Sequence, residues 1–194
     1  QASSSEIFKE SENKLNEQSE FDPKSPYAIA KFKNHNKVFE LREKYGWNIT
    51  SGIMFNHESE FRKNDYLIMK IIQSAIKIKN NKQDILTLGS TSYIRDWSYS
   101  EDIAKAIYQI VINGVSGSYV IGSGVGHKIA DILDIVFNFL DLDWKKFVNI
   151  DESLLRTGDP IKIISDPHRI INDLSWKSEV SFEEMVMKCL TSKL

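Results

Sequence analysis

The chain has 194 residues, 41% of them hydrophobic, which suits one domain with a sizeable core and excludes a short disulfide-stapled module. Its 25 basic and 27 acidic residues give a formal net charge of -2. That balance cannot neutralise a phosphate backbone, so nucleic acid is not an expected partner. The single cysteine, Cys189, suits a reducing compartment. No apolar run reaches the roughly 20 residues of a membrane span, and we expect a soluble, cytoplasmic protein.

The first half of the chain alternates predicted helix and strand. Residues 10–24 are polar and irregular, which is typical of a surface loop. A helix is predicted over Pro26–Tyr45, with Ser25 as its N-cap. A strand over 47–55 and an amphipathic helix over 66–79 follow. Helix and strand in this order are typical of an α/β fold.

The second half continues the alternation. Ser100 is expected to cap one helix, and Ser181, with Glu184 three residues on, another. The sequence shows no clear linker, so we expect one shared core with a smaller C-terminal lobe. The predicted elements are strands over 85–88, 118–121 and 147–150 and helices over 100–114, 128–142 and 182–190.

Two tyrosine–lysine pairs have the spacing that places both side chains on one helix face. Tyr27 and Lys31 lie in the first turns of the predicted helix. An adjacent ammonium favours the phenolate and makes such a tyrosine a usable acid/base for a sugar hydroxyl. Tyr66 and Lys70 repeat the spacing, but inside an apolar run where core packing explains the aromatic ring. The first pair is therefore the better candidate.

A serine-rich segment with one acid lies upstream of this pair. Ser4 offers a hydroxyl and Glu6 a carboxylate. Taken alone, Glu6 is more simply explained as a carboxylate at a helix start or in solvent. Together with Tyr27 and Lys31, the two residues predict a site for proton and hydride chemistry on a hydroxylated substrate.

Five blocks lie in order along nearly the whole chain: residues 1–6, 21–31, 52–59, 88–89 and 95–97. They resemble the extended short-chain dehydrogenase/reductases and, within them, the GDP-mannose 4,6-dehydratase family. The most specific are Phe-Asn-His-Glu-Ser at 55–59 and Arg-Asp-Trp at 95–97.

The resemblance implies an α/β fold, namely the C-terminal part of a Rossmann-like doubly wound fold plus a small mixed α/β substrate-binding lobe. Residues 1–122 would hold the C-terminal half of the dinucleotide-binding domain with interleaved lobe segments. Residues 123–194 would hold mainly the nucleotide-sugar lobe and a closing helix. The first strands and the phosphate-binding turn are expected upstream, on the order of a hundred residues or more, so residues 1–194 alone are expected to be inactive.

The resemblance also implies catalytic roles. Tyr27 would be the acid/base at the sugar O4, while Lys31 would lower its pKa and hold the nicotinamide ribose. Ser4 would hydrogen-bond the O4 region, and Glu6 would take the C5 proton and assist loss of water from C6. The expected cofactor is NADP, with NAD as the alternative, and the expected enzyme is a hydro-lyase that makes a 4-keto-6-deoxy sugar.

Binding residues follow from the resemblance and from arginine usage. His57 and Arg62 match positions that contact the dinucleotide. Most of the 25 basic residues are lysines, whereas guanidinium groups suit bidentate contact with a diphosphate. The expected substrate ligands are Arg95 and Arg156, with Asn56 and Lys70 as further candidates. The expected partners are a nucleotide-sugar, GDP-mannose, and further copies of the chain in a dimer or tetramer.

Other polar residues are expected to be structural. Arg42 and Arg169 are assigned to solvated helix faces. The glycine run at 122–126 approaches a dinucleotide-binding fingerprint, but its third glycine comes one residue early, which favours a strand-to-helix connection. No metal site is predicted, because none of three histidines has metal-ligand spacing: His35, His127 and His168.

The sequence departs from the family pattern at three places. Ser4 stands where Thr is common, Glu60 and Phe61 replace a Pro-bearing turn before Arg62, and Asp159 stands where Glu is expected. Two other functions stay open at this point. One is a nucleotide-sugar reductase or epimerase that uses the same tyrosine and lysine, and the other is a non-catalytic fragment that only binds nucleotide-sugar.

Overall fold

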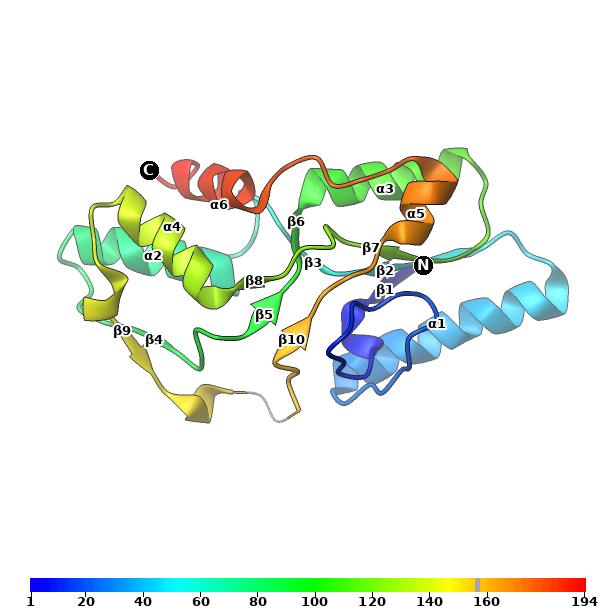
Figure 1. Ribbon diagram of the computed structural model, residues 1–194, viewed down its shortest axis with the longest axis horizontal. Coiled ribbons are helices and arrows are strands. Elements are labelled where there is room, and N and C mark those ends of the chain that lie inside the picture. Colours follow the sequence, from blue (N-terminus) through cyan, green and yellow to red (C-terminus); the bar gives the residue numbers. More distant parts are fainter. Residues whose placement is uncertain (156–157) are drawn as a thin grey trace.

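The computed structural model of the chain describes residues 1–155 and 158–194. Figure 1 shows an elongated molecule with a parallel sheet and its helices at one end and a cluster of three helices at the other. We call these the sheet part and the helical part. The sheet contains β1 (Ala2–Ser4), β2 (Thr50–Met54) and β7 (Gly117–Ile121), parallel and in the order β1-β2-β7.

Helices cover both faces of this sheet. In Figure 1, α1 (Pro26–Tyr45) lies on one side, and α3 (Ser100–Ile112) and α5 (His168–Leu174) lie on the other. Alternate residues of the strands feed two separate apolar clusters, as expected for a doubly covered parallel sheet. The α1 side buries Ile53, Phe55 and Val120, and the α3 side buries Tyr119, Ile121 and Ile110.

The helical part is built from α2 (Leu67–Lys79), α4 (Ile129–Phe139) and α6 (Phe182–Thr191). It also holds a parallel strand pair, β4 (Leu86–Leu88) with β9 (Val148–Ile150). Each helix turns its apolar stripe inward, as their periodicity predicts. The shared core includes Ile71, Ala75, Leu133, Phe137, Val186 and Leu190.

Five short strands join the two parts. β3 (Asn56–Glu58) pairs in parallel with β6 (Trp97–Tyr99), and β5 (Ile94–Arg95) lies between β10 (Lys162–Ile163) and β8 (His127–Lys128). β3 follows β2 after one residue, and β6 runs directly into α3. The predicted α/β class, with a doubly wound sheet and a smaller second part, is confirmed.

The predicted helix starts are mostly confirmed. The hydroxyls of Ser25 and Ser181 accept the backbone N–H three residues on, at 3.0 and 3.2 Å. The prediction for Ser100 is wrong, because extended Tyr99 is the N-cap and Ser100 is the first helical residue. The predicted strand over 47–55 is shorter, with only Thr50–Met54 in the sheet.

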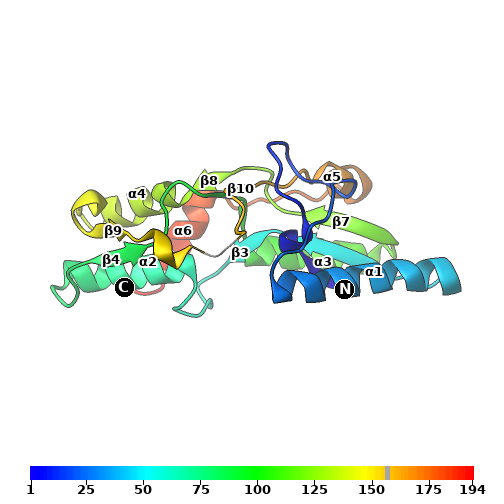
Figure 2. The same ribbon diagram turned by 90° about the horizontal axis from the view of Figure 1, so that it is seen from below.

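The loop of residues 9–24 crosses the sheet part between β1 and α1. Figure 2 shows it on the same side of the molecule as β10 and α5. Leu15 exchanges backbone hydrogen bonds with Ile164 and Asp166, both 2.8 Å. The Glu17 carboxylate accepts the Val120 N–H of β7 at 2.6 Å, and burial raises the pKa of Glu17. The loop thus satisfies a backbone donor of an edge strand.

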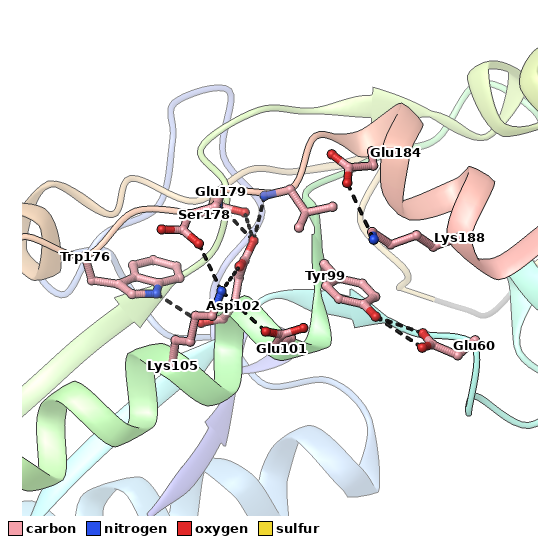
Figure 3. A network of polar contacts seen from close by, with 11 residues as sticks. Glu60, Tyr99, Glu101, Asp102, Lys105, Trp176, Ser178, Glu179, Glu184 and Lys188 are labelled. Atoms are coloured by element: carbon pink, nitrogen blue, oxygen red, sulfur yellow. Dashed lines mark hydrogen bonds and ion pairs between the residues drawn. The ribbon is translucent and has the colours of Figure 1, made fainter.

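Asp102, in the first turn of α3, ties the connection between α5 and α6 to the sheet part (Figure 3). Its buried carboxylate accepts from the Ser178 hydroxyl at 3.2 Å and from the N–H groups of Glu179 and Val180, both at 2.9 Å. The Trp176 indole N–H donates to the Asp102 carbonyl at 3.0 Å. This network sets the path along which the chain crosses from one part to the other.

The assignment of Arg42 to a solvated face is wrong. Its guanidinium donates to the carbonyls of Gly117 at 2.6 Å and Ile49 at 3.2 Å. Arg42 therefore fixes the end of α1 to the starts of β2 and β7. Arg169 keeps 38% of its side chain exposed, with its guanidinium 4.8 Å from the centroid of the Tyr119 ring. Among the described residues, no helix combines the length and hydropathy needed to cross a membrane.

Candidate active site

A cleft of about 770 Å³ opens between the sheet part and the helical part. Its walls come from the end of β1, the start of α1, the strands of the junction and the start of α2. Five of the predicted site residues line it: Glu6, Asn56, Arg62, Lys70 and Arg95. Four others are not on its walls: Ser4, Tyr27, Lys31 and His57. Arg156 lies outside the described residues.

Glu6 lies in the short 3-10 turn, Ser5–Ile7, that follows β1, and is held at the positive end of α1. Its carboxylate accepts from the Ser25 hydroxyl at 3.4 Å, and that hydroxyl also accepts the Ala28 N–H at 3.0 Å. The Ser4 hydroxyl accepts the Glu6 N–H at 3.3 Å. Parallel strands and the helices that follow them place such groups at one sheet edge, and the helix dipole favours an anion there. Ser25 is thus a contact of Glu6 that the sequence showed only as a helix cap.

Tyr27 and Lys31 share a face of α1, as their spacing predicts. The ammonium of Lys31 lies 5.5 Å from the centroid of the Tyr27 ring and donates to the Ala2 carbonyl at 2.9 Å. Tyr27 is 52% exposed. The pair lies beside the cleft, one turn from Ser25 and Ala28, which do line it.

Two cations reach the cleft from different elements. Arg95 of β5 has only 12% of its side chain exposed, and its guanidinium lies 2.8 Å from the carboxylate of Asp159 and 3.3 Å from the Ile161 carbonyl. The ammonium of Lys70 in α2 donates to the Thr87 carbonyl at 3.0 Å. The Arg95–Asp159 pair spans the cleft rim and has no signal in the sequence, because 64 residues separate the partners.

A third cation, Arg62, lies between an acid and an aromatic ring. Its Nε is 3.3 Å from a carboxylate oxygen of Glu58, and its guanidinium carbon is 3.5 Å from the centroid of the Tyr66 ring. Burial raises the pKa of Glu58 to about 7, against the opposing effect of Arg62. The assignment of Tyr66 to core packing is wrong, since this residue is the N-cap of α2, is 44% exposed and lines the cleft.

The glycine run at 122–126 connects β7 to β8 and α4, as expected, and two of its backbone donors are held by an internal carboxylate. The fully buried carboxylate of Asp96 accepts the N–H groups of Ser123 and Gly124 at 2.9 Å and that of Ser165 at 3.1 Å. Gly124 has a φ of +77°, which brings its N–H toward the same carboxylate. An internal carboxylate here takes the donors that a phosphate would need.

The histidines have structural contacts. His35 is buried, with Nδ1 2.9 Å from the Ser51 hydroxyl, and burial lowers its pKa. His127 stacks on Phe182 with the ring centroids 3.8 Å apart. Nδ1 of His57 lies 2.9 Å from the Phe55 carbonyl, which orients this ring beside the cleft.

Comparison with known proteins gives consistent relatives. The chain is 34% identical over 186 residues to GDP-mannose 4,6 dehydratase 2 of Arabidopsis thaliana. This alignment covers 96% of this chain and 50% of the relative. The Drosophila melanogaster GDP-mannose 4,6 dehydratase is 30% identical and is covered over 52% of its length. The chain thus spans about half the length of these curated relatives.

Solved structures share the fold. RMD from Pseudomonas aeruginosa, complexed with NADPH, superposes with a TM-score of 0.88 at 18% identity, over 98% of this chain and 64% of that chain. At the sequence level, residues 1–189 match the profile of the family described as GDP-mannose 4,6 dehydratase. With the cleft, its carboxylate and its cations, this match shows that the chain belongs to the GDP-mannose 4,6-dehydratase family.

Proposed function

We propose that the protein carrying this chain is a nucleotide-sugar 4,6-dehydratase, a hydro-lyase that converts GDP-mannose to GDP-4-keto-6-deoxymannose. The observation that carries the proposal is the position of Glu6. Its carboxylate lies in the cleft wall and accepts from Ser25, the N-cap of the helix that presents Tyr27 and Lys31. A base and a phenol–ammonium pair at one sheet edge suit removal of a carbon-bound proton and transfer of a hydroxyl proton.

The residues present suit a nicotinamide dinucleotide. The exposed Tyr27 phenol and the neighbouring Lys31 ammonium form a donor set that matches ribose hydroxyls. The cofactor, when bound, supplies the reversible acceptor for hydride. NADP is the cofactor we propose, and His57 and Arg62 are the residues proposed to hold its far end.

The chain's own residues then divide the proton transfers. Tyr27 takes the proton of the sugar O4 hydroxyl, and the Lys31 ammonium favours the phenolate that does so. Ser4 donates a hydrogen bond to the O4 region. A keto group at C4 acidifies the C5 proton, which Glu6 removes and passes to the departing C6 hydroxyl, so that the C6–O bond breaks and water leaves.

The cleft cations are proposed to bind the diphosphate of the nucleotide-sugar. Arg95 approaches from the junction strand β5 and Lys70 from α2 of the helical part, and paired cations on one ligand favour a dianionic group over a neutral one. Asn56 and Arg156 complete the proposed substrate set. We further propose a cytoplasmic homo-oligomer, and a division near residue 122 between the dinucleotide-binding and substrate-binding regions.

The Glu6→Gln variant tests the proposed base. In the protein that carries the chain, the variant should still oxidise GDP-mannose at C4, seen as NADPH absorbance, while elimination falls by about 10²- to 10⁴-fold. Exchange of the C5 hydrogen with solvent deuterium should be lost in parallel. Glu12→Gln, which removes an exposed acid elsewhere on the sheet part, should leave both rates unchanged. Dehydration by Glu6→Gln at the parent rate would show that Glu6 is not the base.

A further inference from the structure

Two polar atoms in the cleft wall face one another without a hydrogen bond. Oε2 of Glu58 and Nε of Arg62 are buried, and neither has a hydrogen-bond partner among the described residues. They lie 3.3 Å apart as an ion pair. Buried polar atoms without a hydrogen bond are uncommon and costly, so this ion pair points to a role beyond packing.

The other contacts of Arg62 fix which way its guanidinium faces. Its guanidinium carbon lies over the Tyr66 ring, 3.5 Å from the centroid, and its Nε is turned toward Glu58. About a third of the Arg62 side chain, 34%, stays exposed, against 6% for Glu58. Both residues line the cleft. With one side of the group on an acid and its plane on a ring, the terminal nitrogens remain for a ligand.

Other ionisable groups surround Glu58 from neighbouring elements. Cys189 of α6 interacts with Glu58, but burial raises the pKa of this thiol to about 12, so it stays neutral. Glu60, on the same turn, accepts from the Tyr99 hydroxyl of β6 at 3.0 Å, and Lys193 donates to the Glu60 carbonyl at 2.9 Å. Arg62 is therefore the charged partner in direct contact with Glu58.

We propose that Glu58 is a positioning residue that holds Arg62 toward a phosphate group in the cleft, and that the Glu58 carboxyl takes up a proton when this phosphate binds. The inference rests on the proposed function, because it takes a phosphorylated cofactor or substrate to be the ligand of Arg62. The shared chemistry is a phosphate ester, which either the dinucleotide or the nucleotide-sugar could supply.

The sign of the coupling follows from electrostatics. With the site empty, Arg62 stabilises the ionised Glu58 carboxylate. A bound phosphate brings negative charge near this carboxylate and competes for the same guanidinium, which disfavours the ionised form. Burial already places the pKa of Glu58 at about 7, so phosphate binding should raise this pKa further. Affinity should then fall as the pH rises from 6 to 8.

Calorimetric titration of the protein that carries the chain tests this. NADP and GDP are titrated separately at pH 6, 7 and 8, in buffers of different ionisation enthalpy that report proton uptake. For the ligand that contacts Arg62, expected to be NADP, the Kd should rise about fivefold from pH 6 to pH 8, with a fraction of a proton taken up at pH 7. If the Kd depends on pH for GDP but not for NADP, the coupling between Arg62 and Glu58 is supported and Arg62 is assigned to the substrate.

Variants separate positioning from charge. Glu58→Gln keeps an acceptor for Nε and should bind NADP as tightly as the parent does at pH 6, with the Glu58-dependent pH response removed. Glu58→Ala loses the acceptor and should bind NADP about tenfold more weakly than Glu58→Gln does at every pH. Glu60→Gln, the control on the same turn, should keep the parent response. Comparison across variants cancels protonation of the ligand itself.

Two results would overturn the inference. One is Glu58→Gln with the parent's pH response, and the other is a parent protein that takes up no proton with either ligand. The proposed function has its own readout. If Glu58 takes up a proton on ligand binding as expected but the protein forms no 4-keto-6-deoxy product, the proposed function is contradicted and the inference about Glu58 is not.

Discussion

Single buried carboxylates organise the loops around the cleft. Asp96 is fully buried and accepts from three backbone N–H groups and from the hydroxyls of Ser123 and Ser165. It lies between Arg95 and Trp97, both of which line the cleft. The position of these two neighbours therefore depends on a network that the ligand need not touch.

The Asp96→Asn variant should be strongly destabilised. The amide NH₂ would face backbone donors that need an acceptor, at a cost of about 3 kcal/mol. Urea unfolding followed by circular dichroism measures the change. Asp84→Asn, which removes an exposed carboxylate, should change the free energy of unfolding by less than about 0.5 kcal/mol. Equal effects of the two substitutions would contradict the role given to Asp96.

Glu58 should make stability depend on pH. Its pKa rises from 4.5 to about 7 on folding because of burial, so the folded state binds more protons in that range. The contribution of Glu58 is fully present below pH 4.5 and is lost as the pH rises through about 7. The difference in free energy of unfolding between Glu58→Gln and the parent should grow in favour of the variant from pH 5 to pH 8. A constant difference across this range would refute the assignment.

At the scale of elements, a side-chain N-cap stabilises the start of a helix, and the helices of this chain differ in whether they have one. The Ser181 hydroxyl caps α6, whose inner face buries Met185, Val186, Cys189 and Leu190. By contrast, Tyr99 starts α3 with no side-chain cap.

Two serine-to-alanine changes test this difference. Ser181→Ala should cost about 1 kcal/mol by leaving the Glu184 N–H without its acceptor. Ser100→Ala, a change of the same size at the first residue of α3, should cost less than about 0.5 kcal/mol. Thermal unfolding of both variants measures the two costs. A larger loss of stability for Ser100→Ala than for Ser181→Ala would overturn the assignment of Ser181 as a cap.

The same contrast explains which elements the sequence could predict. Capped helices with apolar periodicity, such as α1 and α6, were predictable to within a residue or two. The junction strands β5, β8 and β10 have two residues each, too few for any alternation to show. Helix α5 has seven residues and starts at His168, after Pro167, which provides no side-chain cap, and it was missed for the same lack of local signal.

The candidate site was predictable only in part. Four residues named as candidates from the sequence line one cleft: Asn56, Arg62, Lys70 and Arg95. The pairing of Arg95 with Asp159 and the stacking of Arg62 on Tyr66 depend on how separate elements meet. An apolar sequence context suggested a buried Tyr66, yet the helix begins one residue later and leaves its ring in the cleft.

At the scale of the whole molecule, the cleft exists because two parts with separate cores are held together. Asp102 contributes to this by binding the 178–180 connection to α3 (Figure 3). That connection carries the chain to α6 and the core of the helical part.

Asp102→Asn should lower the free energy of unfolding by about 3 kcal/mol, because a fully buried carboxylate with three donors loses its charge. Glu101→Gln removes an exposed carboxylate from the same turn and should change it by less than about 0.5 kcal/mol. Chemical unfolding of both variants provides the comparison. An Asp102→Asn variant with the parent's free energy of unfolding would mean that other contacts hold the two parts together.

Product analysis tests most directly the proposed dehydration of a nucleotide-sugar by the protein that carries this chain. The protein that carries this chain is incubated with GDP-mannose and NADP, and the product is identified by mass spectrometry and NMR. The expected product is GDP-4-keto-6-deoxymannose, with the hydrogen from C4 recovered at C6. Unchanged GDP-mannose, together with turnover of another nucleotide-sugar or with a product that keeps its C6 hydroxyl, would contradict the proposal.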